Sequence, residues 1–424
     1  YFAGDEELAR KAVYIVDGLT TYSIDQFFDV FYRPDIIAAK AAGEDISDLT
    51  GPSIAELMRS DGSPPEVEFV TESGTSVSRD ITLKIKVYDT GGGVGKVTVF
   101  LDGMPVTISE GRRGLKAVNK PTGSSVKAAY AYEALVTLRY GANAIEVSAY
   151  NRSNTIESAK AAVELVYTQR TVTKPDLHIL AVAINKYRDR ALWLNYSVND
   201  ANAITEAIPQ KARSLYRQVK VYKLYDNEVT EEKLNAQFDT IAGSVKPDDV
   251  FVFYLAGHGI TNDTDGDYYY LPSNFRYTGS EAITSGGISK NDILENLVKI
   301  PAQKTVLFFD TCNSGSFIET PASRGLTEKT AVDRLKRAIG RAIIVASSES
   351  QVALEGMEDH GVFTYSLLRG LEGAADMNND RFITLSELSV YIENDVPELT
   401  YEKWGYEQIP QKQLPKEDFP LVGR

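Results

Sequence analysis

The fold is decided by two apolar stretches, Val250-Phe-Val-Phe-Tyr-Leu-Ala-Gly-His258-Gly259 and Thr305-Val-Leu-Phe-Phe-Asp310-Thr311-Cys312-Asn313-Ser314-Gly315. Each is a continuous apolar run followed by small and polar residues, which is typical of a strand buried on both faces of a parallel sheet. Strand and helix patterns alternate around them over residues 169–424. This alternation predicts a mainly parallel α/β sheet with helices on both faces.

The patterns also predict where the elements of this domain lie. We expect strands near 177–184, 218–225, 249–256, 304–310 and 341–347. We expect helices near 199–208, 229–242, 289–299, 328–338, 361–372 and 384–395. Open sheets of this kind place their ligands at the carboxyl ends of their strands, where His258 and Cys312 fall.

Cys312 is the only cysteine in the chain, so it has no disulfide partner and cannot build a Cys-rich metal site. Taken alone, it could be a small buried hydrophobe, and His258 could be structural. Their joint position just past two apolar strands favours catalysis. A thiolate is a nucleophile, and an imidazole can deprotonate the thiol and later protonate a leaving amine. The N–H groups of Gly259 and Cys312 are the candidate oxyanion donors, and glycine at 259 allows a close approach of the substrate.

These stretches resemble the caspase-like cysteine peptidases, and among them the metacaspase-like proteins of bacteria. The motifs are Tyr254–Gly259, Asp310–Gly315, Leu177–Tyr187 and Asn199-Asp200-Ala201. They occur in the family's order over about residues 175–424, and His258 precedes Cys312 by 54 residues, near the roughly 50 of caspases. One departure is Asn313, where metacaspases usually carry His. The resemblance implies a cysteine endopeptidase.

The resemblance also implies an acidic specificity pocket formed by Asp310, two residues before Cys312, and Asp200. Two carboxylates in a cleft suit the guanidinium or ammonium of a substrate, so cleavage after Arg or Lys is expected. A buried carboxylate pair without a bound cation would raise the pKa of one member. The alternative is that Asp310 caps a turn and Asp200 caps a helix.

The chain contains two other histidines, His178 and His360. His360 precedes Gly361 and could be a rival base, but it follows a charged loop and is expected to be a residue at a helix start. His178 lies inside the first expected strand and is expected to pack in the core.

Residues 376–387 match the twelve-residue calcium loop of an EF-hand. The matching ligands are Asp376, Asn378, Asp380, the Phe382 carbonyl, Thr384 and Glu387. Arg381 stands where glycine usually takes a positive φ, so a degenerate loop without metal is an open alternative. No cofactor is required for the chemistry, but calcium activation is a hypothesis because many metacaspases are activated by calcium.

The resemblance raises self-processing as well. In caspase-like enzymes, the loop that joins the two halves of the core follows the nucleophile. Arg324, between Ser323 and Gly325, is the candidate self-cleavage site because we expect it in an irregular segment, where nicking concentrates. The alternative is that the basic residues there only solvate a loop.

The first 168 residues predict two further parts. Residues 1–62 look helical and irregular and end in the linker signal Asp61-Gly-Ser-Pro-Pro65. Residues 63–168 alternate apolar and polar side chains in short strands, as in Ile81–Val87. They predict an all-β sandwich that resembles immunoglobulin-like modules, with a spacer role or a protein partner.

Composition excludes some classes of function. The formal net charge is −14 and the pI is near 4.9, which disfavours nucleic acids and anionic membranes. No apolar run approaches the roughly 18 residues of a membrane span, so we expect a soluble protein, with the cytoplasm favoured. A catalytically idle scaffold that binds partners is the second hypothesis. The sequence favours the enzyme, because base, nucleophile and acidic pocket are all present.

Overall fold

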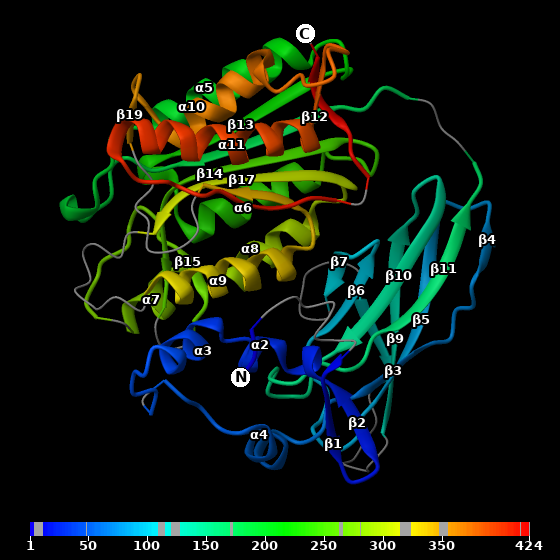
Figure 1. Cartoon of the computed structure of the whole chain (residues 1–424). Coiled ribbons are helices and arrows are strands. Elements are labelled where there is room, and N and C mark those ends of the chain that lie inside the picture. The colour runs from blue at the N-terminus through cyan, green and yellow to red at the C-terminus, as the bar shows by residue number, and fades with distance from the viewer. Residues whose placement is uncertain are drawn as a thin grey trace. The chain divides into compact units, whose positions relative to one another are not determined.

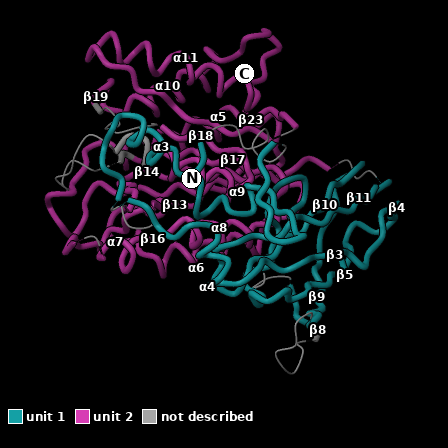
Figure 2. The backbone as a smooth tube through the Cα atoms, turned by 60° about the horizontal axis from the view of Figure 1, so that its bottom comes forward, with its two compact units in different colours: residues 1–171 teal, residues 172–424 magenta. Residues whose placement is uncertain are grey.

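The computed structural model describes residues 1–3, 12–47, 49–108, 115–119, 128–169, 173–262, 266–279, 281–313, 324–346, 355–415 and 417–423. The chain divides into two compact units, Tyr1–Thr171 and Val172–Arg424 (Figure 2). Among the described residues, no helix has the length and apolar character needed to cross a bilayer.

The N-terminal part of the first unit contains a two-stranded hairpin besides the helical and irregular segments expected there. Its elements are β1 (Tyr14–Asp17), β2 (Thr20–Ser23), the 3-10 turn η1 (Ile24–Phe27), α2 (Phe28–Phe31), α3 (Pro34–Ala41) and α4 (Ile54–Asp61). α2 ends at Phe31 and Pro34 begins α3, because proline at a first helical position loses no hydrogen bond. Residues 4–11 of this part lie outside the described residues.

Two antiparallel-rich sheets follow in the first unit. The described residues give a four-stranded sheet in the order β3-β5-β9-β8 and a five-stranded sheet in the order β4-β11-β10-β6-β7. The strands are β3 (Glu66–Phe69), β4 (Gly74–Ser76), β5 (Asp80–Tyr88), β6 (Val97–Leu101), β7 (Met104–Ile108), β8 (Leu115–Asn119), β9 (Ala129–Thr137), β10 (Gly141–Ala149) and β11 (Ala161–Tyr167).

Alternation along the strands builds the core between these sheets. Leu83, Ile85 and Val87 of β5 are buried together with Val99 of β6 and Ile145 of β10. The β6–β7 hairpin turns at Asp102 and Gly103, whose φ angles of 52° and 84° are those of the tight turn that an Asp-Gly pair favours.

The second unit is built on one mainly parallel sheet. Its strand order is β13-β12-β14-β17-β18-β22, with only β22 antiparallel to its neighbour within this path. The strands are β12 (Leu177–Ala183), β13 (Val219–Tyr225), β14 (Val250–Thr261), β17 (Lys304–Asn313), β18 (Ala342–Val345) and β22 (Gln411–Gln413). The short strand β15 (Tyr268–Tyr270) pairs antiparallel with the end of β14, and β16 (Ile288–Ser289) pairs antiparallel with β15.

Helices cover both faces of this sheet, as predicted (Figure 1). One face carries α5 (Ser197–Ala212), α10 (Val362–Arg369) and α11 (Leu385–Trp404), and the other carries α6 (Glu231–Ala242), α8 (Lys290–Lys299) and α9 (Arg324–Ile339). Odd and even positions of β14 enter different cores: Phe251 and Phe253 face α6, whereas Val252 and Tyr254 face the opposite layer. The apolar runs are continuous because both faces are buried.

Shorter elements complete the second unit. They are the 3-10 turns η2 (Arg190–Leu192) and η3 (Asp226–Glu228), helix α7 (Glu281–Gly286), the hairpin β19 (Glu355–Met357) and β20 (His360–Gly361), the π-turn η5 (Gly370–Ala374), and the pair β21 (Phe382–Thr384) and β23 (Pro420–Gly423). The helix expected over 328–338 begins earlier, at Arg324, and the strands expected at 249–256 and 304–310 run on to Thr261 and Asn313.

Candidate functional site

His258 and Cys312 are brought together by the register of two neighbouring strands. β14 and β17 pair in parallel from Val250 opposite Lys304 to Gly259 opposite Asn313, and His258 lies directly opposite Cys312. Neighbouring strands are about 4.8 Å apart, and opposed residues share a face of the sheet. The structure describes Cys312 through its backbone, which occupies the carboxyl end of its strand as the sequence predicts.

The His258 ring is oriented by a carbonyl that the sequence does not reveal. Its Nε2 lies 2.8 Å from the backbone oxygen of Leu192, the last residue of the 3-10 turn η2 that follows β12. A carbonyl only accepts hydrogen bonds, so Nε2 carries the hydrogen and Nδ1 is the nitrogen with the lone pair. The backbone N–H of His258 donates to the Tyr187 hydroxyl at 2.8 Å, and the two ring centroids are 5.0 Å apart.

Burial controls the charge of this histidine. Only 7% of His258 is exposed. Burial lowers the pKa of His258 to about 4, and the Leu192 carbonyl acts in the opposite direction. The imidazole is therefore neutral at physiological pH, which is the state required of a general base.

Two glycines beside His258 make room for tyrosines. Gly257 has a φ of 143°, and a Cβ there would lie 2.7 Å from the Tyr187 hydroxyl. A Cβ on Gly259 would lie 2.6 Å from the Tyr268 ring. Packing therefore requires glycine at both positions. The oxyanion role of Gly259 stays a prediction, because packing alone explains the glycine.

Asp200 and Asp310 converge near one point at the same edge of the sheet. They are 3% and 8% exposed. A Cβ added to Gly361 would lie 3.2 Å from Oδ2 of Asp200 and 3.4 Å from Oδ2 of Asp310. Asp310 accepts hydrogen bonds from Thr364 at 2.6 Å and from Tyr254 at 3.3 Å. The structure therefore brings together the two carboxylates that the sequence singled out.

His360 is a partner of this acidic pair rather than only a residue before a helix. Its Nδ1–H donates to Oδ1 of Asp200 at 2.6 Å, and the Gly361 N–H donates to Oδ2 at 3.1 Å. The hydrogen bond with Asp200 raises the pKa of His360. Burial raises the pKa of Asp200, and the hydrogen bonds from His360 and Gly361 act against that shift. His360 lies in β20, away from the strand register that joins His258 and Cys312.

The EF-hand-like loop forms a tight turn between η5 and α11. Arg381 adopts a φ of 71°, so this arginine occupies the conformation that glycine usually takes, and its N–H donates to Oδ2 of Asp376 at 3.2 Å. Oδ1 of Asp376 and Oε1 of Glu387 are buried without a hydrogen-bond partner. Glu387 also closes the capping box of α11 through Thr384. Asn378 and Asp380 are bonded to each other at 3.1 Å, and the Phe382 N–H donates to Asp380 at 2.8 Å.

Arg324 lies in a different setting from the one expected. It is the first residue of α9, whereas residues 314–323 lie outside the described part of the chain. The expectation of an irregular segment at Arg324 itself is therefore wrong, because the helix extends four residues further toward the N-terminus than its apolar pattern predicts.

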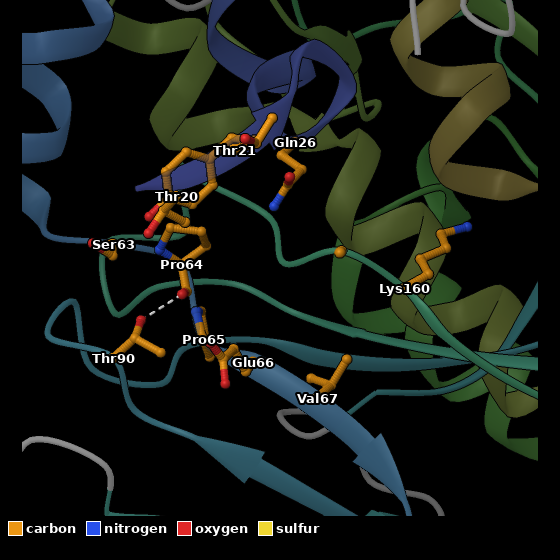
Figure 3. A pocket seen from close by; sticks show the side chains of 12 residues that line it. Thr20, Thr21, Gln26, Ser63, Pro64, Pro65, Glu66, Val67, Thr90 and Lys160 are labelled. Carbon is orange, nitrogen blue, oxygen red and sulfur yellow. Dashed lines mark hydrogen bonds between the residues drawn. The ribbon is translucent and has the colours of Figure 1, made fainter. Parts of the chain in front are cut away.

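A separate cleft of about 400 Å³ lies in the first unit, lined among others by Gln26, Pro64, Thr90 and Lys160 (Figure 3). Thr90 donates to the Pro64 carbonyl at 2.6 Å, and the Gln26 amide donates to the Glu157 carbonyl at 2.9 Å. The Thr90 hydroxyl and the Gln26 amide are thus already hydrogen-bonded within the unit.

Sequence reasoning missed the groups that support the candidate residues: the Leu192 carbonyl, Tyr187, Tyr254, Gly361 and Thr364. Tyr187 and Tyr254 fall in the quoted motifs, and Gly361 follows a histidine and precedes an apolar helix, but none of these signals reveals the contact that the residue makes. The others act through hydrogen bonds between segments far apart in the chain.

Solved structures resemble parts of the chain at low identity. A protein of Geobacter sulfurreducens is 17% identical, with a TM-score of 0.40, over 59% of this chain and 97% of that one. A FixG-related protein from Vibrio parahaemolyticus is 10% identical, with a TM-score of 0.16, over 25% and 99%. Murine CRIg is 14% identical, with a TM-score of 0.17, over 25% and 98%. No curated protein matches the chain.

A family model supplies the assignment. The model of the caspase domain, Peptidase_C14, matches residues 178–419, more than half of the 424 residues. The matched segment includes the paired strands β14 and β17 and the convergent carboxylates. The chain therefore belongs to the caspase-domain family of cysteine peptidases.

Proposed function

We propose that this protein is a cysteine endopeptidase in which Cys312 is the nucleophile and His258 the general base. The observation that carries the proposal is the register that sets His258 opposite Cys312 at the carboxyl ends of β14 and β17. The Leu192 carbonyl supports it, because it leaves the lone pair on Nδ1 of His258. Asn313 stands where metacaspases usually carry His, so a closer relationship to metacaspases is also a proposal.

The reaction follows from these groups. His258 takes the proton of the Cys312 thiol, and the sulfur attacks the carbonyl carbon of the scissile bond. The N–H groups of Gly259 and Cys312 stabilise the oxyanion. The imidazolium then protonates the leaving amine, and water hydrolyses the thioester and restores the thiol. A pKa of about 4 for His258 favours a neutral pair before substrate binds, rather than a preformed ion pair.

Asp200 and Asp310 are proposed to bind the Arg or Lys side chain before the cut. Support comes from their convergence beside Gly361 and from their burial, which strengthens attraction to a cation. The carboxylate of Asp200 is held by His360, which a basic substrate side chain would have to displace or share.

A fluorogenic peptide assay tests the enzyme against the idle scaffold. We expect hydrolysis after Arg or Lys, none after Asp, and loss of activity in Cys312→Ala. His258→Ala should cost at least about 10²-fold in kcat. Absence of turnover on every basic peptide, with and without calcium, would favour the scaffold. Cleavage after Asp would contradict the pocket but not the dyad.

Calcium binding at residues 376–387 is a second proposal, favoured by the unpartnered oxygens of Asp376 and Glu387. Buried carboxylate oxygens without partners are costly, and a cation would relieve that cost. Calorimetry with Ca²⁺ on wild type and Glu387→Gln tests the site. Gln retains the capping box while removing the charge. Equal binding by both proteins would exclude the loop.

Self-processing at Arg324 is a further proposal, and the helical position of Arg324 adds a requirement to it. Cleavage after Arg324 would need the first turn of α9 to unwind, since a protease cleft takes an extended peptide. Mass spectrometry of wild type beside Cys312→Ala decides it: fragments ending at a basic residue within 324–341 must appear in wild type only. An intact and fully active wild-type chain would discard the proposal.

The two sheets of the first unit are proposed to be an immunoglobulin-like module that acts as a spacer or binds a protein partner. The shared core of Leu83, Val99 and Ile145 supports a sandwich. A pull-down with the Cys312→Ala chain, compared with the same chain carrying a disrupted sandwich core, would reveal partners that depend on this unit.

A further inference from the structure

Three ionisable side chains converge at the amino-terminal edge of the large sheet, at the opposite strand ends from His258 and Cys312. Asp176 directly precedes β12, His178 is the second residue of that strand, and Asp249 directly precedes β14. They are 3%, 0% and 4% exposed. One ligand atom from each residue lies within 4.8 Å of the other two, an arrangement that no other His, Cys, Asp or Glu set matches in the described ranges.

Strand pairing produces this convergence. Asp176 and His178 are two residues apart, so they lie on the same side of their strand. β12 and β14 pair with Leu177 opposite Val250, which sets Asp176 level with Asp249. The Asp176 N–H donates to Oδ1 of Asp249 at 2.8 Å, and the Val250 N–H donates to the Asp176 carbonyl at 2.9 Å.

Two polar atoms of this cluster are buried without a hydrogen-bond partner: Nε2 of His178 and Oδ1 of Asp176. Oδ2 of Asp176 accepts a hydrogen bond from Arg217 at 2.5 Å and lies 3.9 Å from the Lys220 ammonium. Only one of the two carboxylate oxygens of Asp176 is therefore hydrogen-bonded. Nε2 of His178 lies 3.5 Å from Oδ2 of Asp249, too far for a good hydrogen bond.

A chain of hydroxyl groups fixes the tautomer of His178. Ser244 donates to the Ile241 carbonyl at 3.0 Å, so the Tyr222 hydroxyl, 3.2 Å from Ser244, must donate to it. The Tyr222 oxygen then accepts from Nδ1–H of His178 at 3.4 Å. In this tautomer the Nε2 lone pair of His178 faces the carboxylates of Asp176 and Asp249.

Lone pairs facing carboxylate oxygens repel one another unless a cation lies between them. We propose that Asp176, His178 and Asp249 bind a divalent transition-metal ion of the zinc class, through Oδ1, Nε2 and Oδ2. Zinc takes imidazole and carboxylate ligands at about 2.0–2.2 Å, which sets ligand atoms about 3.4 Å apart. The His178–Asp249 separation of 3.5 Å already fits this spacing. Tyr222 orients the imidazole, as partners of ligating histidines commonly do.

The ion would join the chain at the starts of β12 and β14, and through Tyr222 it would also reach β13. Imidazole in the donor set favours zinc over Mg²⁺ or Ca²⁺. Arg217 is 54% exposed and binds the other oxygen of Asp176, so the ion does not need to displace it. The role is structural, because the site is at the other edge of the sheet from the proposed nucleophile.

The test uses the full chain with Cys312→Ala, which removes the thiol that competes for soft metals. After chelator treatment, Co²⁺ is added and visible absorption is followed, and Zn²⁺ is then used to displace it. We expect one ion per chain and a thermal midpoint that rises with metal concentration. His178→Gln and Asp176→Asn each change a ligand, so each should weaken binding by at least the about 10–100-fold that loss of an outer-shell partner costs.

Two controls make the result specific. Asp248→Asn makes the same change at the exposed neighbour of Asp249, and Glu387→Gln disables the EF-hand-like loop, so both should leave Co²⁺ binding intact. Asp176→Asn keeps an oxygen that can accept from Arg217. If His178→Gln does not fold, Asp176→Asn still tests the site. Absence of a Co²⁺ band at saturating metal, or a band that survives in every folded ligand variant, would overturn the proposal.

Discussion

At the scale of single residues, backbone groups and glycines set the properties of the candidate site. The Leu192 carbonyl selects the tautomer of His258, and burial keeps the ring neutral. Gly361 allows the Asp200 and Asp310 carboxylates to share one point. Each effect is a contact of a few ångströms, so single substitutions should separate them.

His258 should make stability depend on pH. Its pKa is about 4 in the folded protein and about 6.5 in an unfolded chain. Between these values the unfolded chain binds more protons, so the free energy of unfolding should fall as pH falls from about 6.5 to about 4, by about 3 kcal/mol at most. Urea unfolding at several pH values, compared with His258→Asn, isolates this contribution. Identical pH profiles for the two proteins would contradict it.

Gly361→Ala should weaken binding of basic substrates. Gly361 has φ −65° and ψ 147°, which alanine adopts without strain, so the effect must come from the new methyl group. The methyl would press on Asp200 and Asp310 at 3.2 and 3.4 Å. We expect a several-fold higher KM for Arg peptides with a smaller change in kcat. Gly243→Ala, which meets nothing closer than 3.5 Å, is the control and should leave KM unchanged.

At the scale of elements, strands and loops hold residues in conformations that their own sequence does not favour. The turn before α11 is one such element, since Arg381 and Asn379 both have positive φ angles, 71° and 60°. Non-glycine residues in this region carry strain of about 1–3 kcal/mol. The surrounding hydrogen bonds to Asp376 and Asp380 maintain the conformation.

Replacing Arg381 with glycine should therefore stabilise this turn whether or not calcium is present. We expect the free energy of unfolding to rise by about 1 kcal/mol, the relief of strain exceeding the entropy lost by glycine. Urea unfolding with and without Ca²⁺ measures it. Arg369→Gly, in a helical residue, should destabilise the protein by about the same amount. A destabilised Arg381→Gly protein would show that the arginine makes compensating contacts.

At the scale of the whole molecule, the two units have separate apolar cores. Leu83 lies in the core of the first unit and Phe253 in one of the two cores beside the large sheet of the second. Domains with their own cores unfold as separate cooperative units unless a large interface couples them.

We expect calorimetry to resolve two unfolding transitions. Leu83→Ala should lower the midpoint temperature of one transition, and Phe253→Ala that of the other. In each case the free energy of unfolding of that unit should fall by about 2–5 kcal/mol, as is typical of a large-to-small core change. A single transition that shifts as a whole in both variants would mean that the units unfold together.

The sequence by itself determined the α/β class of residues 169–424 and the location of the candidate residues. Continuous apolar runs predict buried strands because both faces of a parallel sheet are covered. The positions of His258, Asp310 and Cys312 follow from where those apolar runs stop, near the carboxyl ends of β14 and β17, whereas Asp200 lies in the first turn of α5. Membership of the caspase-domain family confirms the resemblance of residues 178–419 to caspase-like proteins and their α/β fold.

The tertiary structure alone decided which groups meet. Strand register set His258 opposite Cys312, and the 3-10 turn η2 supplied the Leu192 carbonyl. Asp176 and Asp249 are 73 residues apart, yet adjacent strands bring them together beside His178. Arg324 became helical although its local pattern gave no apolar stripe there. Such contacts depend on pairing offsets and loop paths, which are set by the packing of the whole domain and leave no periodic signal in the sequence.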